Sequence, residues 1–167
     1  MKIYAFADEA NNMIDGQIEA MKTTGIDGLE VRGVDNVNIS DISIAKAREV
    51  KKKMDDAGLK VWSIGSPIGK IDFIKGSFAT EVEKLRRTLE TADVLGAENI
   101  RLFSFYFPKD ANKADYKNEV IDRLGIFLEY ARGTGITLCH ENENGIYGDV
   151  PERCLEIHKA LPEMKAI

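Results

Sequence analysis

The sequence predicts an α/β protein built on a parallel sheet, and three observations lead to that prediction. Four stretches share one layout, in which a glycine is followed within a few residues by a short apolar, β-branched run. These glycines (Gly25, Gly58, Gly96 and Gly135) are between 33 and 39 residues apart. The runs are too short for helices and lack clean alternation, which is typical of strands buried on both faces. The segments between them have helical periodicity, so the order is that of a parallel sheet with right-handed crossovers.

The first strand and helix are expected at the amino terminus. "KIYAFA" has the composition of a strand, and residues 11–24 follow as a helix that ends before Gly25. A glycine here suits the left-handed residue that closes many helices. The run "GLEVRG" after it predicts the second strand.

Three further helices are expected, in residues 40–58, 79–96 and 115–135. The first of them has Ser40 or Asp41 as its candidate cap. Each keeps its apolar residues on one face and ends close to a glycine, as a helix packed against a sheet does.

A fifth helix is expected from Asp149 to Leu161. Asp149 and Glu152 have the spacing of a capping box, and Pro151 stands in the first turn. Residues 164–167, "MKAI", predict the beginning of a sixth strand.

Composition indicates one soluble globular domain over residues 1–167, without an internal linker. The net charge of −5 and the pI near 5.2 argue against nucleic acid and anionic membranes as partners. No apolar run approaches the roughly 18 residues of a membrane span, and the amino terminus lacks a secretion signal. We therefore expect a cytoplasmic protein, with Cys139 and Cys154 as free thiols.

Two architectures are compatible with this alternation. A doubly wound parallel sheet of five strands fits the length of 167 residues. A barrel of eight βα units needs roughly 200 residues or more. Length alone favours the open sheet.

Four stretches in register at the ends of the predicted strands favour the barrel. "GIDGLEVRG", "SIGSPIGKI", "NIRLFSFY" and "TLCHENENGIYGD" resemble, in this order, the xylose isomerase-like TIM barrels. This group contains sugar isomerases, sugar-phosphate epimerases and endonuclease IV-like enzymes. The resemblance covers nearly the whole chain. It implies a (β/α)8 TIM barrel truncated here to about five βα units and the start of strand six.

The resemblance also implies a divalent metal (Mn, Mg, Co or Zn) at the carboxyl face of the full-length enzyme. Acidic and histidine side chains from strands five to eight would bind it. The Asp, His and second Glu expected on the later strands are absent from this sequence. We therefore expect a fragment of a longer enzyme, inactive alone and without a tight metal site.

Glu141 matches the family's metal ligand on strand five, and in the epimerases this glutamate also exchanges a proton next to a carbonyl. If Glu141 points into the barrel, side-chain alternation places Cys139 and Thr137 inside with it and turns His140 outward. Carboxylate oxygen suits hard divalent cations. The alternative is a solvated loop glutamate with no role.

Five further residues are candidates for substrate binding: Ser66, Lys70, Ser104, Tyr106 and Asn142. Lys70, on the loop "GSPIGK", could neutralise an anionic group such as phosphate, or be solvated. Ser104 and Tyr106 could bind sugar hydroxyls, or Tyr106 could simply cover the neighbouring phenylalanines. Asn142 could orient the site or serve a turn.

Charged residues also lie within the apolar strand runs, where an unpaired charge is costly. We expect Arg101 to pair with Glu30, because strands two and four of such a barrel share layers. Glu143, one step past the fifth strand, is left open between substrate contact and solvent.

The sequence therefore predicts a metal-dependent isomerase or epimerase that acts on a small sugar or sugar phosphate. One alternative is an endonuclease IV-like hydrolase, which is disfavoured because neither His140 nor His158 stands at the end of strands two to four. Another is a non-enzymatic open-sheet binding module, which needs no metal. A truncated barrel would expose two strand edges, so homo-oligomers or aggregates are expected of the chain alone.

Overall fold

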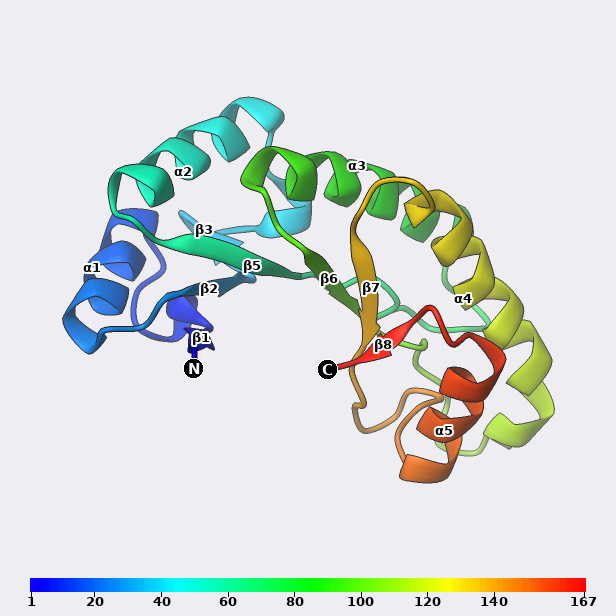
Figure 1. The fold of residues 1–167 in the computed structure, drawn as a ribbon. Coiled ribbons are helices and arrows are strands. Elements are labelled where there is room, and N and C mark those ends of the chain that lie inside the picture. Colours follow the sequence, from blue (N-terminus) through cyan, green and yellow to red (C-terminus); the bar gives the residue numbers. More distant parts are fainter. The chain divides into compact units, whose positions relative to one another are not determined.

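The computed structural model describes residues 1–167, and the six main strands alternate with five α-helices (Figure 1). In order, these are β1 (Tyr4–Ala5), α1 (Ile14–Thr24), β2 (Gly28–Val31), α2 (Ile44–Asp56), β5 (Lys60–Gly65), α3 (Phe78–Leu95), β6 (Asn99–Leu102), α4 (Lys117–Ala131), β7 (Thr137–His140), α5 (Pro151–Ala160) and β8 (Lys165–Ala166). The five predicted helices and the six predicted strands are therefore confirmed.

The six main strands form one sheet in the order β1-β2-β5-β6-β7-β8. The pairs β1/β2, β2/β5 and β7/β8 are parallel. Strand order thus equals chain order, with a helix in each crossover. A doubly wound sheet reverses its strand order at a switch point, whereas a barrel adds strands in sequence. The open-sheet alternative is therefore wrong, and the fold is of the truncated TIM-barrel type.

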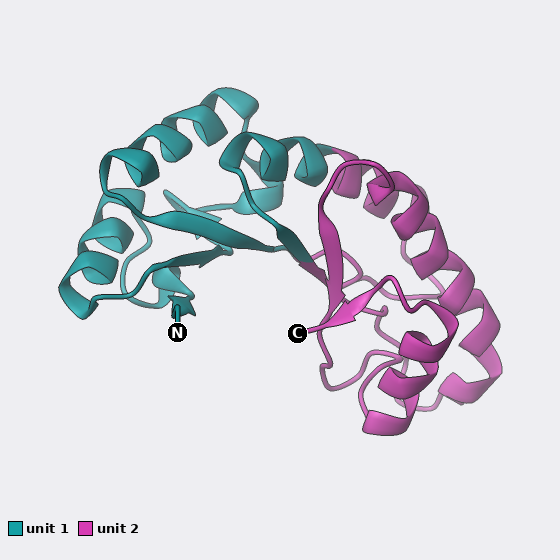
Figure 2. Cartoon of the chain, viewed as in Figure 1, with its two compact units in different colours: residues 1–66, 87–100 teal, residues 67–86, 101–167 magenta.

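Two compact units divide the chain (Figure 2). Unit 1 comprises residues 1–66 and 87–100, and unit 2 comprises residues 67–86 and 101–167. Helix α3 and strand β6 contribute residues to both.

In unit 1, helices α1 and α2 bury apolar faces, with Ile14, Val50 and Met54 almost fully covered. The sheet contributes residues such as Leu29 and Ile64, which are also buried. Burial of side chains of this size contributes roughly 1.5–3 kcal/mol each. The burial of one apolar face on each of these two helices thus holds them against the sheet.

Helix α2 begins later than the sequence indicated. Its N-cap is Ser43, whose side chain accepts a hydrogen bond from the backbone N–H of Lys46 at 3.1 Å. The predicted caps Ser40 and Asp41 lie instead in a short 3-10 helix, Ile39–Asp41, whose cap is Asn38. Asparagine, serine and aspartate can each cap a helix, and these residues lie so close together that local sequence did not distinguish them.

A short hairpin was not predicted. Strands β3 (Gly33–Val34) and β4 (Val37–Asn38) pair antiparallel around Asp35 and Asn36. Both turn residues have positive φ, 51° and 67°. Asp and Asn tolerate this conformation, and a two-residue loop of this kind is typical of tight hairpins.

Three of the four glycines that mark the repeat close helices as predicted, whereas Gly135, with φ of 80°, lies beyond the end of α4 at Ala131. Gly25, Gly58 and Gly96 each follow a helix with φ of 70°. The capping-box prediction for the fifth helix is wrong. The N-cap of α5 is Val150, without a side-chain hydrogen bond. Asp149 instead forms ion pairs with two cations of unit 2, Lys113 and Arg153.

Unit 2 is organised by an aromatic cluster under the loop that follows β5. Phe73 of this loop stacks on Phe107 with ring centroids 4.8 Å apart and meets Phe105 edge-on at 5.6 Å. Arg123 of α4 covers Phe73 at 3.8 Å and donates from Nη1 to its carbonyl oxygen. Such contacts stabilise aromatic groups beyond simple burial. They hold the loop in place beside the end of β6.

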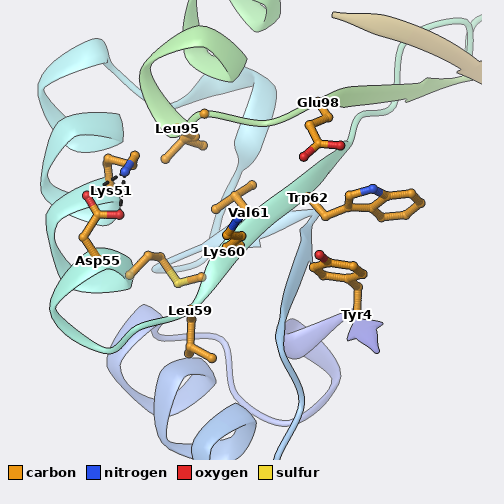
Figure 3. Close-up of a pocket in the computed structure, with 11 residues that line it drawn as sticks. Tyr4, Lys51, Asp55, Leu59, Lys60, Val61, Trp62, Leu95 and Glu98 are labelled. Atoms are coloured by element: carbon orange, nitrogen blue, oxygen red, sulfur yellow. Dashed lines mark hydrogen bonds and ion pairs between the residues drawn. The ribbon is translucent and has the colours of Figure 1, made fainter. Parts of the chain in front are cut away.

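A pocket of about 180 Å³ lies in unit 1, between the ends of α2 and α3 and the start of β5 (Figure 3). On the side of β5 away from the Lys51–Asp55 ion pair, Tyr4 stacks on Trp62 with ring centroids 5.3 Å apart. The pocket adjoins the first residues of β1 and β5. In parallel α/β folds, active sites lie at the opposite, carboxyl ends of the strands. None of the predicted site residues lines this pocket.

No helix of the structure has the length and apolar character needed to cross a membrane.

Candidate active site

Three segments meet at the carboxyl ends of β6 and β7, all within unit 2. The backbone N–H groups of Phe103 and Tyr106 donate to the carbonyls of Ile68 and Ile71, at 2.9 and 2.8 Å. The backbone N–H of Phe107 donates to the carbonyl of Gly145 at 3.0 Å. The loops after β5, β6 and β7 are therefore fastened to one another by main-chain hydrogen bonds.

Gly69 fixes the path of the first loop. Its φ is +84°, and its N–H donates to Oε2 of the buried Glu81 at 2.7 Å. A Cβ at this position would lie 2.0 Å from the carbonyl oxygen of Phe103. Only glycine combines the left-handed conformation with such a close approach of two backbones. The next residue, Lys70, is thereby directed toward the end of β7.

Glu141 follows β7 directly and is held by Arg101 of β6. The Arg101 Nη1 atom lies 2.6 Å from Glu141 Oε2. The Arg101 side chain is only 10% exposed, while that of Glu141 is 34% exposed. The guanidinium is therefore built into the fold, and the carboxylate projects from it toward solvent.

Glu143 is held by two donors from the other loops. Lys70 Nζ lies 2.5 Å from Glu143 Oε2, and the Tyr106 hydroxyl donates to Oε1. Burial disfavours the carboxylate, but the hydrogen bonds from Lys70 and Tyr106, with the charges of Lys70 and Arg101, outweigh it and lower the pKa of Glu143. Burial, the hydrogen bond to Glu143 and its charge raise the pKa of Tyr106 to about 12. Tyr106 thus stays protonated and Glu143 ionised near neutral pH.

The side chains of Arg101, Glu141, Lys70, Tyr106 and Glu143 form a charged cluster. His140 faces away from this cluster, as side-chain alternation predicted. Its Nε2 atom lies 2.9 Å from Ser104 Oγ, which also accepts a hydrogen bond from the Gly148 N–H at 2.8 Å. Because that hydroxyl has one hydrogen to donate, a neutral His140 accepting at Nε2 satisfies both groups. Burial lowers the pKa of His140 to about 4.

This burial predicts that stability depends on pH. His140 has a folded pKa of about 4 and an unfolded value near 6.5, so the unfolded chain binds more protons between these values. The stabilising contribution is complete above pH 6.5 and is lost as the pH falls toward 4. We expect the free energy of unfolding to drop by about 2 kcal/mol between pH 7 and pH 5. Urea titrations at the two pH values measure it.

His158 provides the control, since it is exposed on α5 and is the chain's other histidine. His158→Gln should keep the pH dependence, whereas His140→Gln should lose most of it. Equal slopes for His140→Gln and the wild type would contradict the assignment.

The remaining predicted site residues are placed differently. Ser104 is fully buried, and its hydroxyl is engaged by His140 and Gly148. Asn142 is exposed at the end of β7. Ser66 is fully buried at the end of β5 and belongs to unit 1, whereas the other candidates lie in unit 2. Of the predicted residues, the structure joins Lys70 and Tyr106 through Glu143, whereas Glu141 binds Arg101, whose charge also acts on Glu143.

Two members of the cluster were not assigned to it from the sequence. Arg101 was predicted to pair with Glu30, and that pairing stays a prediction. The structure pairs Arg101 with Glu141. Glu143 was left open between substrate and solvent. The sequence did hold a signal for the contact between Arg101 and Glu141, because Arg101 is a charged residue in an apolar strand run, one strand before Glu141. The contact of Glu143 with Lys70 joins loops 73 residues apart, and no local pattern reports it.

The residues present do not form a complete metal site. No group of three or more His, Cys, Asp or Glu side chains in the structure is arranged to hold one metal ion. Glu141 offers a single carboxylate, of which Oε2 binds Arg101. Its other oxygen, Oε1, is of the type that Mg²⁺ and Mn²⁺ prefer. The chain thus fits one ligand position rather than a complete coordination sphere.

The chain was compared with protein families and with proteins of known structure. The family model described as "Xylose isomerase-like TIM barrel" matches residues 18–165. No protein of curated function matches the sequence. Among solved structures, the chain is similar to 3-keto-D-glucoside 4-epimerase, YcjR, from E. coli, with 19% identity and a TM-score of 0.76 over 99% of this chain and 66% of that one.

Two further structures are similar. An L-ribulose 3-epimerase has 22% identity and a TM-score of 0.75, covering 100% of this chain and 59% of that one. The IOLI protein, solved with a zinc atom, has 16% identity and a TM-score of 0.77, covering 97% and 59%.

The chain spans less than two thirds of the length of each of these proteins. At such low identity they establish the fold alone. The family model shows more than the fold, because it matches the sequence itself over residues 18–165, which is most of the chain. The sequential parallel sheet, the site at the carboxyl ends of its strands and the family match over residues 18–165 agree that this chain belongs to the xylose isomerase-like TIM barrel family.

Proposed function

We propose that the protein, at its natural length, is a metal-dependent isomerase or epimerase acting on a sugar or sugar phosphate. One observation carries the proposal: a partly exposed carboxylate, Glu141, stands at the carboxyl end of β7 and is paired with a buried arginine, Arg101. Two of the similar structures are sugar epimerases, which supports the reaction class.

Glu141 would contribute one ligand to the metal and would exchange a proton with the carbon next to the substrate carbonyl. A divalent cation, when bound, polarises that carbonyl and stabilises negative charge on its oxygen. Arg101 is a positioning residue, since its ion pair fixes the direction of the carboxylate before substrate arrives.

Tyr106, Lys70 and Asn142 complete the proposed substrate contacts. Tyr106 and Lys70 are fixed by Glu143, whereas Asn142 is exposed beside Glu141. These groups would hydrogen-bond substrate oxygens rather than take part in proton transfer. Ser66 and Ser104 would support the loops from buried positions.

Deuterium exchange tests the proposed reaction. The natural-length protein is incubated in D₂O with Mn²⁺ or Mg²⁺ and a panel of aldoses, ketoses and their phosphates. We expect metal-dependent incorporation of deuterium at the carbon next to the carbonyl, followed by NMR. Exchange with none of the sugars, or cleavage of DNA at abasic sites, would refute the proposal.

A further inference from the structure

The ion pair between Lys70 and Glu143 is partly exposed to solvent. Lys70 Nζ lies 2.5 Å from Glu143 Oε2, yet the two side chains are 35% and 29% exposed. An ordinary surface ion pair is mobile and contributes little. This pair is anchored at both ends, so it can act as a binding surface.

The anchors come from three segments. The Tyr106 hydroxyl binds Glu143 Oε1, and Lys70 Nζ lies 4.2 Å from the centroid of the buried Phe103 ring. The Tyr106 backbone bridges both to Asp72 and to Ile146. Because these groups are ordered before any ligand arrives, binding loses little side-chain entropy.

The pair offers a donor beside an acceptor. A lysine ammonium has three N–H donors, of which Glu143 Oε2 takes one. Each carboxylate oxygen of Glu143 can accept a further hydrogen bond. Two neighbouring hydroxyl groups on a sugar match this arrangement, because one can donate to the carboxylate while the other accepts from the ammonium.

The charge of the cluster is balanced. Lys70 is compensated by Glu143, and Arg101 by Glu141. A phosphate group placed on Lys70 would therefore also lie beside the carboxylate of Glu143. Repulsion between the phosphate and the carboxylate would disfavour binding of a phosphorylated ligand.

We propose that Lys70 and Glu143 form a subsite for a vicinal diol of an uncharged sugar, and that Glu143 excludes a phosphate group from Lys70. This inference rests on the proposed function, whose substrate class it narrows. It replaces the expectation that Lys70 receives an anion.

Inorganic phosphate tests the exclusion without any turnover. Calorimetric titrations at low ionic strength compare the wild type with Glu143→Gln, which keeps an oxygen acceptor for Tyr106 but removes the charge. We expect the variant to bind phosphate at least about tenfold more tightly. The double variant Lys70→Met/Glu143→Gln should lose this gain.

Glu129→Gln is the matched control, because it removes the same charge from an exposed ion pair with Arg132 at the end of α4. It should bind phosphate like the wild type. Thermal melts establish that each variant is folded. Unchanged phosphate affinity in folded Glu143→Gln, or a gain that persists without Lys70, would overturn the inference.

Substrate preference supplies the second readout. The exchange assay with D-fructose and D-fructose 6-phosphate, and with other matched pairs, should favour the free sugar by at least about tenfold in kcat/KM. Glu143→Gln should lower the ratio of kcat/KM for the free sugar to kcat/KM for its phosphate. A wild-type preference for the phosphate would overturn the inference and leave the isomerase intact. Exchange with no sugar at all would refute the proposed function, while the phosphate titration would still decide the subsite.

Discussion

Glu141→Gln is expected to lower turnover of the natural-length enzyme by at least about 100-fold, the contribution of a positioned acid/base group. The amide cannot take up the proton, and it is a poorer metal ligand than a carboxylate. Its oxygen can still accept the hydrogen bond from Arg101 Nη1, which lies 2.6 Å from the carboxylate in the wild type. The substitution is therefore expected to affect catalysis much more than the stability of the fold. Deuterium exchange measures the first and urea unfolding the second.

Metal titration accompanies this measurement. Affinity for Mn²⁺ should fall in Glu141→Gln, because one anionic ligand is lost. Glu90→Gln, on the exposed face of α3, is the charge control and should keep both activity and metal affinity. Activity near that of the wild type in Glu141→Gln would refute the role of this residue.

Gly69→Ala is expected to lower the free energy of unfolding by about 2–5 kcal/mol, the sum of left-handed strain and overpacking. The added Cβ would lie 2.0 Å from the carbonyl oxygen of Phe103, which is backbone and cannot rotate away. The hydrogen bond between Phe103 N–H and Ile68 would be displaced with it. Lys70 would then lose its position beside Glu143, so substrate binding should weaken as well.

Gly58→Ala separates the two contributions. Gly58 has a φ of +70°, but nothing lies within 4 Å of the position that an alanine Cβ would occupy there. This substitution should cost about 1–2 kcal/mol from backbone conformation alone. Urea titrations of the two variants give the difference. Equal losses for both would mean that the contact with Phe103 relaxes at no cost.

The strand and helix order was predictable because each element carries its own signal. The glycines at the helix ends adopt positive φ, as at Gly25 and Gly58, and the apolar runs after them are buried. Elements whose signal is brief were missed. The hairpin around Asp35 and Asn36 has strands of two residues each, and the cap of α2 is Ser43, shortly after the predicted Ser40 or Asp41.

Strand order was beyond the reach of local pattern. Both a doubly wound sheet and a barrel consist of alternating strands and helices, and length alone favoured the first. The structure decides for sequential order, β1 through β8. The resemblance had indicated the same result through residues at the strand ends.

Some features of the candidate site were likewise predictable from the sequence, and others were not. From the sequence by itself came the fold class, the place of Glu141 at the end of a parallel strand and the opposite orientation of His140, because side-chain alternation is a local property. Only the tertiary structure decided that Arg101 holds Glu141 and that Lys70 and Tyr106 converge on Glu143. These contacts join residues 37 to 73 positions apart, and they depend on loop paths set by close packing around Gly69 and Phe103. Loop paths of this kind follow from packing between distant segments, which leaves no periodic trace in the chain.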